Sequence, residues 1–226
     1  MGNRNLIITI EREYGSGGRI VGRKLAEDLG IHFYDDEILK LTSEKSAIGE
    51  EYFRLADEKA GNNLLHRIVG RKLDFTEEPV LSGNVTAPEN LFRFQSSVIR
   101  ELAREESCII VGRAAGYVLD QEEELERLIR IFVCADKVRR VQRVMEVDAI
   151  DEERAKRRIK KMEKSRREYY KYFTGSEWHN MKNYDLTINT TNLDLDQTAE
   201  LVKDYIRLKG LRMILARRTY FRMMGE

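Results

Sequence analysis

The chain has 226 residues, of which 42% are hydrophobic and two are proline, so it can bury a full core as one domain and is neither disordered nor fibrous. Forty lysines and arginines face 39 aspartates and glutamates, and the net charge of +1 gives no overall field that would favour nucleic acid or an anionic membrane. No apolar run approaches the ~20 residues of a membrane span. Residues 1–5 lead straight into a strand-like segment rather than a signal peptide, so we expect a cytoplasmic protein.

Residues 6–29 have the order strand, glycine loop, helix. Leu6–Ile10 is a β-branched run typical of a buried strand, whereas Val21, Leu25 and Leu29 recur every four residues, the spacing of one helix face. The glycines between them allow positive φ and close backbone approach, so successive N–H groups can converge on an anion at the positive end of the helix. The predicted phosphate-binding residues are Tyr14, Gly15, Ser16, Gly17, Gly18 and Arg19.

This loop departs from the common phosphate-loop pattern G-x-x-x-x-G-K-[ST]. If Gly17 is its last glycine, Gly18 stands in the place of the lysine and Arg12 in the place of the first glycine. Arg19 is then the nearest cation, one position late.

Two other interpretations of the loop remain open. It could be a glycine turn that joins strand to helix without a ligand. It could also belong to a dinucleotide site, because Asp35 lies about 20 residues after the glycines, where an acid that binds a ribose is expected. Against this, the pattern G-x-G-x-x-G counted from Gly15 requires a third glycine where the chain has Ile20.

The next segments continue a strand–helix alternation. Residues 31–36 read as a second strand that ends in two acids, after a helix that stops at Gly30, a residue typical of helix carboxyl ends. From 37 to about 72 the pattern is helical but irregular, and 74–89 holds both prolines and reads as an extended loop. Residues 90–106 form an amphipathic helix with large apolar side chains along one side.

Three further apolar runs predict strands, at 108–113, 128–134 and 184–189. Strands that alternate with helices imply an α/β fold, here a five-stranded, mainly parallel sheet flanked by helices. In such sheets ligands bind beyond the carboxyl ends of the strands. Gly15, Asp35 and Arg113 all lie at such ends.

The cysteines and histidines give no metal site. Cys108 and Cys134 both fall in expected strands, so we interpret them as reduced core residues rather than as a disulfide or a metal pair. His32, His66 and His179 are too scattered for the spacing of zinc ligands.

The segment 154–171 is strongly basic in an otherwise balanced chain, with ten lysines or arginines and two acids, Glu163 and Glu168. Arg166 interrupts an apolar helical stripe there and should point inward, which is costly unless it meets an anion or a carboxylate. Arg166 is therefore a candidate phosphate clamp; the alternative is a solvated basic helix in which it pairs with a local acid. The stripe consists of Ala155, Ile159, Met162, Tyr169 and Phe173.

Four motifs stand out in the chain: Tyr14–Gly22, Phe33–Asp36, Val111–Ala115, and Arg158–Tyr170 with Tyr172–Trp178. Together they resemble the cytidylate kinase-like branch of the nucleoside monophosphate kinases, and the likeness extends to about Gly210. In order and spacing they are similar to the phosphate loop, the acid on the monophosphate side, the arginine that holds the acceptor phosphate, and the arginine-rich lid. The resemblance implies a single P-loop kinase-like domain over 1–226, with a helical acceptor-side insertion at 37–106 and a basic helical lid at 147–175.

It also implies a role for each candidate residue. The glycine loop would hold the donor phosphates, Arg19 would take the electrostatic role of the missing lysine, and Arg113 would hold the acceptor phosphate. Asp35 would orient the sugar or base of the acceptor, although it also suits the N-cap of a helix that begins at Glu37. The lid residues implied in catalysis are Lys164, Arg166 and Arg167. Mg²⁺ would be bound by the phosphates of ATP rather than by an all-protein cage.

Three functions follow from these features. The leading one is an ATP-dependent nucleoside monophosphate kinase, acting on CMP or a related small acceptor, with no nucleic-acid or membrane partner. The second is a regulatory module that binds nucleotides without turnover, because the loop lacks its lysine. The third is an oxidoreductase, which would bind NAD and not ATP. The sequence leaves the acceptor and the oligomeric state open, and we expect the tail over 211–224 to pack on the domain.

Overall fold

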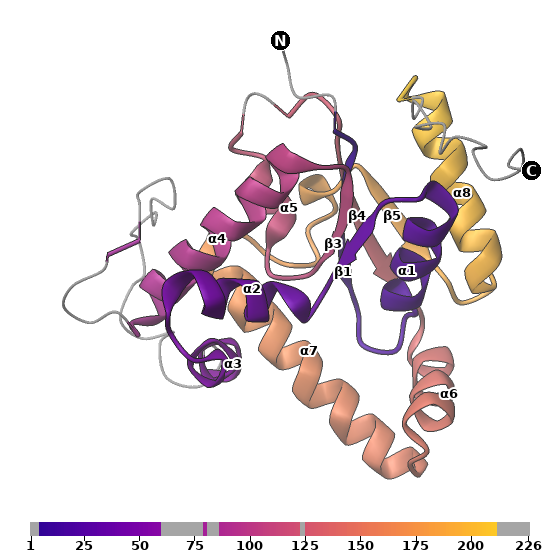
Figure 1. The fold of residues 1–226 in the computed structure, drawn as a ribbon. Coiled ribbons are helices and arrows are strands. Elements are labelled where there is room, and N and C mark those ends of the chain that lie inside the picture. Colours follow the sequence, from indigo (N-terminus) through magenta and orange to yellow (C-terminus); the bar gives the residue numbers. More distant parts are fainter. Residues whose placement is uncertain (1–4, 60–78, 81–85, 123–124, 212–226) are drawn as a thin grey trace, which may run out of the picture.

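The computed structural model describes residues 5–59, 79–80, 86–122 and 125–211. Its centre is a five-stranded sheet in the order β2-β3-β1-β4-β5, in which every strand pair is parallel (Figure 1). This confirms the predicted sheet. The strands are β1 (Ile7–Arg12), β2 (His32–Tyr34), β3 (Cys108–Val111), β4 (Leu128–Cys134) and β5 (Leu186–Asn189).

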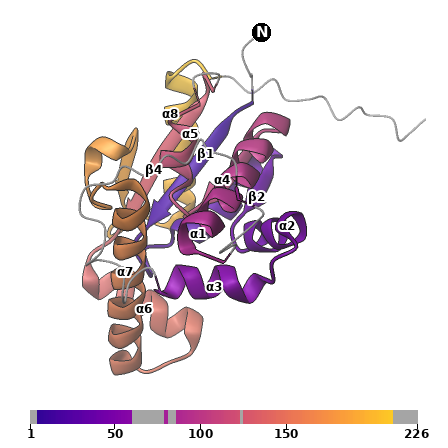
Figure 2. The same ribbon diagram turned by 90° about the vertical axis from the view of Figure 1, so that its left-hand side faces the viewer.

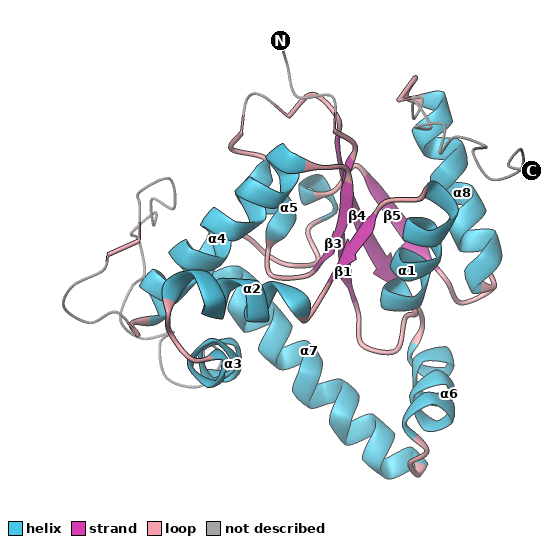
Figure 3. Ribbon diagram, viewed as in Figure 1, coloured by secondary structure: helices cyan, strands magenta, loops and turns pink. Residues whose placement is uncertain are grey.

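Helices connect the strands and cover the sheet (Figure 3). They are α1 (Gly18–Leu29), α2 (Glu37–Ser46), α3 (Glu50–Lys59), α4 (Pro88–Glu105), α5 (Ala115–Leu119), α6 (Lys137–Asp148), α7 (Glu152–Thr174) and α8 (Leu195–Leu208), with a short 3₁₀ helix at Met181–Asn183. As expected, α1 ends at Gly30, whose φ of 64° is the left-handed conformation that glycine favours. None of the described helices is long and apolar enough to span a bilayer.

The core consists of two apolar layers, one on each face of the sheet. Side chains alternate along β1, so Ile7 packs with α4 and α5, while Ile8 and Ile10 pack with α1 and α8. Figure 1 shows these helix pairs on opposite sides of the strands. Cys108 is buried in this core, and Cys134 is a second free, half-buried cysteine.

Two groups of helices pack beside the sheet. In the first, α2, α3 and α4 share a small apolar cluster that contains Leu39, Phe53 and Leu91. In the second, α6 and α7 pack against each other near the carboxyl ends of the strands (Figure 2). An aspartate side chain caps the amino end of each helix. Both groups therefore lie close to the edge of the sheet where the glycine loop emerges.

Several boundaries differ from the sequence predictions. The strands predicted at 31–36, 108–113 and 184–189 are shorter, and the second of these ends at Val111 because Gly112 and Arg113 have positive φ. The loop expected over 74–89 includes the start of α4, which begins at Pro88; proline suits a first helical turn because its missing N–H would have no acceptor there. β1 continues past Ile10 to Arg12, because Arg12 still pairs with Val133 of β4. Residues 74–78 and 81–85 of that loop, and the tail from 212 to 224, lie outside the described residues.

Candidate functional site

The register of the sheet brings the predicted site residues to one edge. Ile10 pairs with Val111, and Tyr34 pairs with Ile110, so the residues after β1, β2 and β3 emerge side by side. A cavity of about 460 Å³ opens at this edge, between the glycine loop, α6 and α7. The predicted site residues that line it are Tyr14, Gly15, Gly17, Gly18, Arg19, Asp35, Arg113 and Arg166.

The glycine loop is held in a fixed shape beneath this cavity. Gly15 and Gly17 have φ of 82° and 89°, which other residues rarely adopt. A Cβ on Gly15 would lie 2.8 Å from the carbonyl oxygen of Arg140, so α6 packs directly on the loop. Ser16 is fully buried, and its hydroxyl donates to the Glu13 carbonyl at 2.9 Å rather than facing the cavity.

The loop ends at the amino end of α1. Within the described residues, no side chain caps this end at Gly17. The first N–H groups of a helix have no acceptor within the helix, and the helix dipole makes this end positive. Oriented N–H groups beside a cavity therefore form the anion-binding arrangement that the glycine pattern predicts.

Gly18 is packed too tightly to carry a side chain. A Cβ at this position would lie 2.7 Å from Cβ of Arg12 and 3.2 Å from Cβ of Val133. Both neighbours belong to strands and have little freedom to shift. The missing lysine thus has a steric reason: in this backbone, the side chain of Arg12 occupies the space next to position 18.

Arg19 lines the cavity but turns toward the acids after β2. Its Nε lies 2.6 Å from Oδ2 of Asp35, and its Nη2 lies 3.7 Å from Oδ2 of Asp36. The side chain is 53% exposed. In the described structure its charge is directed at these carboxylates.

Asp35 does not act as the N-cap of α2. Asp36 occupies that position, and no side chain of the described residues caps this end. The buried Asp35 carboxylate instead lies between Arg19 and Arg12, whose Nη2 is 3.4 Å from Oδ1. The alternative of a simple helix cap is therefore replaced by a carboxylate bound to two guanidinium groups in the cavity.

Arg113 sits on a strained turn that a buried carboxylate holds in place. Arg113 and Ala114 have φ of 58° and 51°, a region that costs energy for residues other than glycine. Glu11, 7% exposed, accepts the N–H of Ala114 at 3.2 Å and the indole N–H of Trp178 at 2.9 Å. The turn directs Arg113 toward the cavity, where its guanidinium lies 3.9 Å from the Asp36 carboxylate.

Arg166 points inward from α7, as its place on the apolar stripe predicts. Its Nη1 donates to the backbone carbonyl of Arg12 at 2.7 Å, and its guanidinium lies over the ring of Tyr14, 5.4 Å from the centroid. Burial and the nearby charge of Arg12 lower the pKa of Arg166 to about 9. Arg166 forms no ion pair with any described residue, so the alternative, in which it pairs with a local acid, is not found among them.

Three predicted site residues lie away from the cavity. Ser16 is buried in the loop, and Lys164 is exposed, 3.8 Å from the carboxylate of Glu168. Arg167 lines a separate basic hollow between α6 and α7. Successive helical residues differ by about 100° in direction, which separates Arg167 from its neighbour Arg166.

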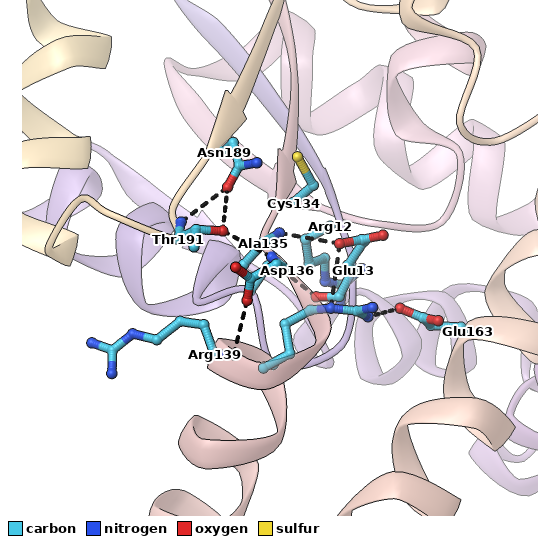
Figure 4. A network of polar contacts seen from close by, with 12 residues as sticks. Arg12, Glu13, Cys134, Ala135, Asp136, Arg139, Glu163, Asn189 and Thr191 are labelled. Atoms are coloured by element: carbon cyan, nitrogen blue, oxygen red, sulfur yellow. Dashed lines mark hydrogen bonds and ion pairs between the residues drawn. The ribbon is translucent and has the colours of Figure 1, made fainter.

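A polar network that was not predicted from the sequence lies beneath the loop (Figure 4). Glu13 accepts the N–H of Ala135 at 3.1 Å and lies 3.5 Å from Nε of Arg140, whose other end pairs with Glu163. Burial raises the pKa of the Glu13 carboxyl, but the hydrogen bonds from His179 and Ala135 outweigh it, and the pKa falls below its usual value. This network ties the loop to β4, α6 and α7.

Two further arginines were not singled out as site residues. Arg12 and Arg143 both line the cavity, and Nη1 of Arg143 donates to the carbonyl of Gly15 at 2.8 Å. The available signal was the pair of charged residues, Glu11 and Arg12, at the end of a buried apolar strand directly before a glycine loop. Charges placed there must meet partners or a ligand.

The arrangement suits a ligand with several negative charges. Helix N–H groups, four guanidinium groups that are not exposed and a carboxylate pair share one hollow. The four arginines are Arg12, Arg113, Arg143 and Arg166. No cluster of three histidine, cysteine, aspartate or glutamate side chains among the described residues could hold a metal ion.

Comparisons with known proteins show which family and which solved structures the chain is similar to. The sequence model of the cytidylate kinase-like family matches residues 7–192. A crystal structure titled as an uncharacterized protein from Eubacterium ventriosum ATCC 27560 is 28% identical, covers 90% of this chain and 99% of its own, and superposes with a TM-score of 0.64. Shikimate kinases from Acinetobacter baumannii and Bacteroides thetaiotaomicron are more distant.

The Acinetobacter enzyme, in complex with shikimate, is 16% identical over 93% of this chain and 97% of its own, with a TM-score of 0.47. The Bacteroides enzyme is 15% identical over 91% and 98%, with a TM-score of 0.48. No curated protein matches the chain. Since the family model spans most of the sequence, from β1 to just past β5, the protein belongs to the cytidylate kinase-like family.

Proposed function

We propose that this protein is an ATP-dependent phosphotransferase that acts on a nucleoside monophosphate or a similarly small phosphorylated acceptor. The observation that carries the proposal is the convergence of the glycine loop, Arg113 and Arg166 on one cavity. These groups come from three distant parts of the chain. A turn without a ligand would not need them to meet.

In phosphoryl transfer the protein mainly positions the substrates and forms no covalent bond with them. Phosphoryl transfer requires donor and acceptor to be held in line, and the charge on the moving group to be neutralised while water is excluded. The N–H groups of the loop would hold the donor phosphates. Arg113 would hold the acceptor phosphate, and Arg166 on α7 would neutralise charge that develops between them.

Two observations support the binding of ATP by these residues. The loop is a cradle with positive φ at Gly15 and Gly17, where a Cβ would collide with its neighbours. The guanidinium groups of Arg12 and Arg166 both have a lowered pKa, chiefly because they are buried, and an anion would relieve that cost. When bound, Mg²⁺ would supply charge neutralisation on the phosphates and would be held mainly by phosphate oxygens and water.

The acceptor side is assigned to the region beyond β2 and β3. Asp35 lies there between Arg12 and Arg19, and α2, α3 and α4 pack together beside it. We propose that 37–106 forms the acceptor-side insertion and 147–175 the lid.

The test is a coupled assay of ADP release with a panel of nucleoside monophosphates, run beside thermal melting with ATP and with NAD. We expect ATP to raise Tm, since a ligand at 100 times its Kd adds about 2.7 kcal/mol to the stability. We also expect ADP release with at least one acceptor. A Tm that rises with NAD and not with ATP would instead support an oxidoreductase.

A regulatory module is the second candidate, and the packing at Gly18 favours it specifically. Position 18 has no room for the lysine of the common loop, since a Cβ there would lie 2.7 Å from Arg12. Stabilisation by ATP, with no ADP release for any acceptor in the panel, would establish this function in place of the kinase.

Arg113→Ala is expected to weaken use of the acceptor and to leave donor binding nearly intact. The Arg113 side chain, 11% exposed, lies at the end of β3, beside the acids of the acceptor side. Loss of a charge-assisted contact of this kind costs about 1.5–3 kcal/mol, so kcat/KM for the acceptor should fall roughly 10- to 100-fold. Steady-state kinetics with each substrate varied in turn measure this. A raised KM for ATP with unchanged acceptor kinetics would contradict the assignment.

A further inference from the structure

We propose that Arg12 is a phosphate-binding residue, and that it supplies from the end of β1 the charge that a lysine at position 18 supplies in the common loop. The inference rests on the proposed function for the identity of the donor. Its central claim, binding of a polyphosphate anion by Arg12, does not require turnover.

Arg12 and position 18 compete for the same space. Cβ of Arg12 lies 2.7 Å from the position that a Cβ on Gly18 would take. A glycine at 12, as in the common loop, would leave this space open for a side chain at 18. Here the two positions are exchanged: the strand residue carries the cation, and the helix residue carries none.

The guanidinium of Arg12 lies between the donor loop and the acceptor side. A Cβ on Gly112, whose φ is 80°, would collide with Nη1 of Arg12, so the Arg12 side chain runs across the sheet edge from β1 toward β3. The guanidinium thus lies beside the turn that carries Arg113 and lines the cavity between the donor loop and the acceptor side. A transferred phosphoryl group has to pass through this region.

Arg12 has few partners for its buried charge among the described residues. Its Nε is buried and has no hydrogen-bond partner among the described residues. Its nearest carboxylate oxygen belongs to Asp35 at 3.4 Å, and Arg19 holds the other oxygen of that carboxylate more closely, at 2.6 Å. Burial lowers the pKa of Arg12, and the positive charge of Arg113 adds to the effect, although Glu11 and Asp35 oppose it. The cavity therefore holds a largely buried cation that shares its close carboxylate with the guanidinium of Arg19.

Arg19 differs from Arg12 in the exposure of its side chain and in its ion pairs. The Arg19 side chain is 53% exposed, against 15% for Arg12, and it already pairs with Asp35 and Asp36. A cation in bulk solvent contributes little to anion binding compared with a desolvated one. Arg12 is thus the better placed of the two for the electrostatic role of the lysine.

The experiment measures binding of inorganic triphosphate by isothermal titration calorimetry at fixed ionic strength, with Tm recorded for each ligand-free variant. Arg12→Met should weaken binding at least tenfold, as expected for loss of a charge-assisted contact. Arg12→Lys should recover part of the affinity, because it restores the charge without the fork. Arg19→Met should change the affinity less than threefold.

The matched control is Arg23→Met on α1, outside the cavity, which should leave the affinity unchanged. Arg12→Gln serves as a second variant if Arg12→Met fails to fold, because it keeps a hydrogen-bond donor toward Asp35. A variant at Arg12 with a lower Tm but wild-type affinity would show a purely structural role and overturn the proposal. Failure of the wild-type protein to bind triphosphate would also overturn it.

These outcomes are separable from those of the kinase proposal. Triphosphate binding that depends on Arg12, together with no ADP release for any acceptor, would remove the kinase and keep the role of Arg12. If turnover and triphosphate affinity are both unchanged in Arg12→Gln and in Arg12→Met, the kinase proposal stands and the role of Arg12 is removed.

Discussion

Arg166→Ala is expected to lower turnover about a hundredfold while changing the Kd for ATP only severalfold. The arginine reaches the cavity from α7, and it forms no ion pair with any described residue that its loss would leave uncompensated. A cation aimed at charge that develops during transfer contributes mainly to the transition state, and losing one such preorganised group costs roughly 3 kcal/mol. The expected signature is a fall in kcat without a matching rise in KM.

Single-turnover kinetics and calorimetry with ATP measure the two quantities separately. Lys161→Ala, an exposed cation on the same helix that does not line the cavity, is the control for the general loss of positive charge on α7. Full turnover in Arg166→Ala would assign the residue to structure alone, through its hydrogen bond to the carbonyl of Arg12.

The fold could be predicted because its signals are local. The central strands β3 and β4 are short, mainly apolar runs, and Gly30 marks the end of α1 by a conformation that glycine favours. A parallel sheet then places the loop, Asp35 and Arg113 at one edge, as the structure shows. The inward direction of Arg166 followed from helical periodicity, and the same periodicity could have removed Lys164 and Arg167 from the cavity.

The remaining site residues depend on contacts that no local pattern encodes. Arg12 enters the cavity because β1 continues two residues beyond its apolar run and because Gly112 leaves room for its guanidinium. Arg143 meets the loop only because α6 packs on Gly15. Asp35 suited a helix cap equally well by sequence; the register of β2 against β3 is what brings it to the arginines.

The same packing decides what happens when the missing lysine is restored. Gly18→Lys is expected to destabilise the protein by about 1–3 kcal/mol and to lower turnover rather than raise it. The new Cβ would lie 2.7 Å from Cβ of Arg12 and 3.2 Å from Cβ of Val133, so either β1 or the start of α1 must shift. Such a shift would displace Arg12 and the N–H groups that end the loop. Urea denaturation and the ADP-release assay measure the two effects.

Two companion variants separate the clash from the added charge. Gly18→Ala introduces the Cβ alone and should account for most of the lost stability. Ile20→Lys adds a lysine two residues later, at a side chain that is 46% exposed, and should change the stability by no more than about 0.5 kcal/mol. A Gly18→Lys protein as stable as wild type, with faster turnover, would show that the position accepts the lysine. The steric account of its absence, and with it the exchange between positions 12 and 18, would then be wrong.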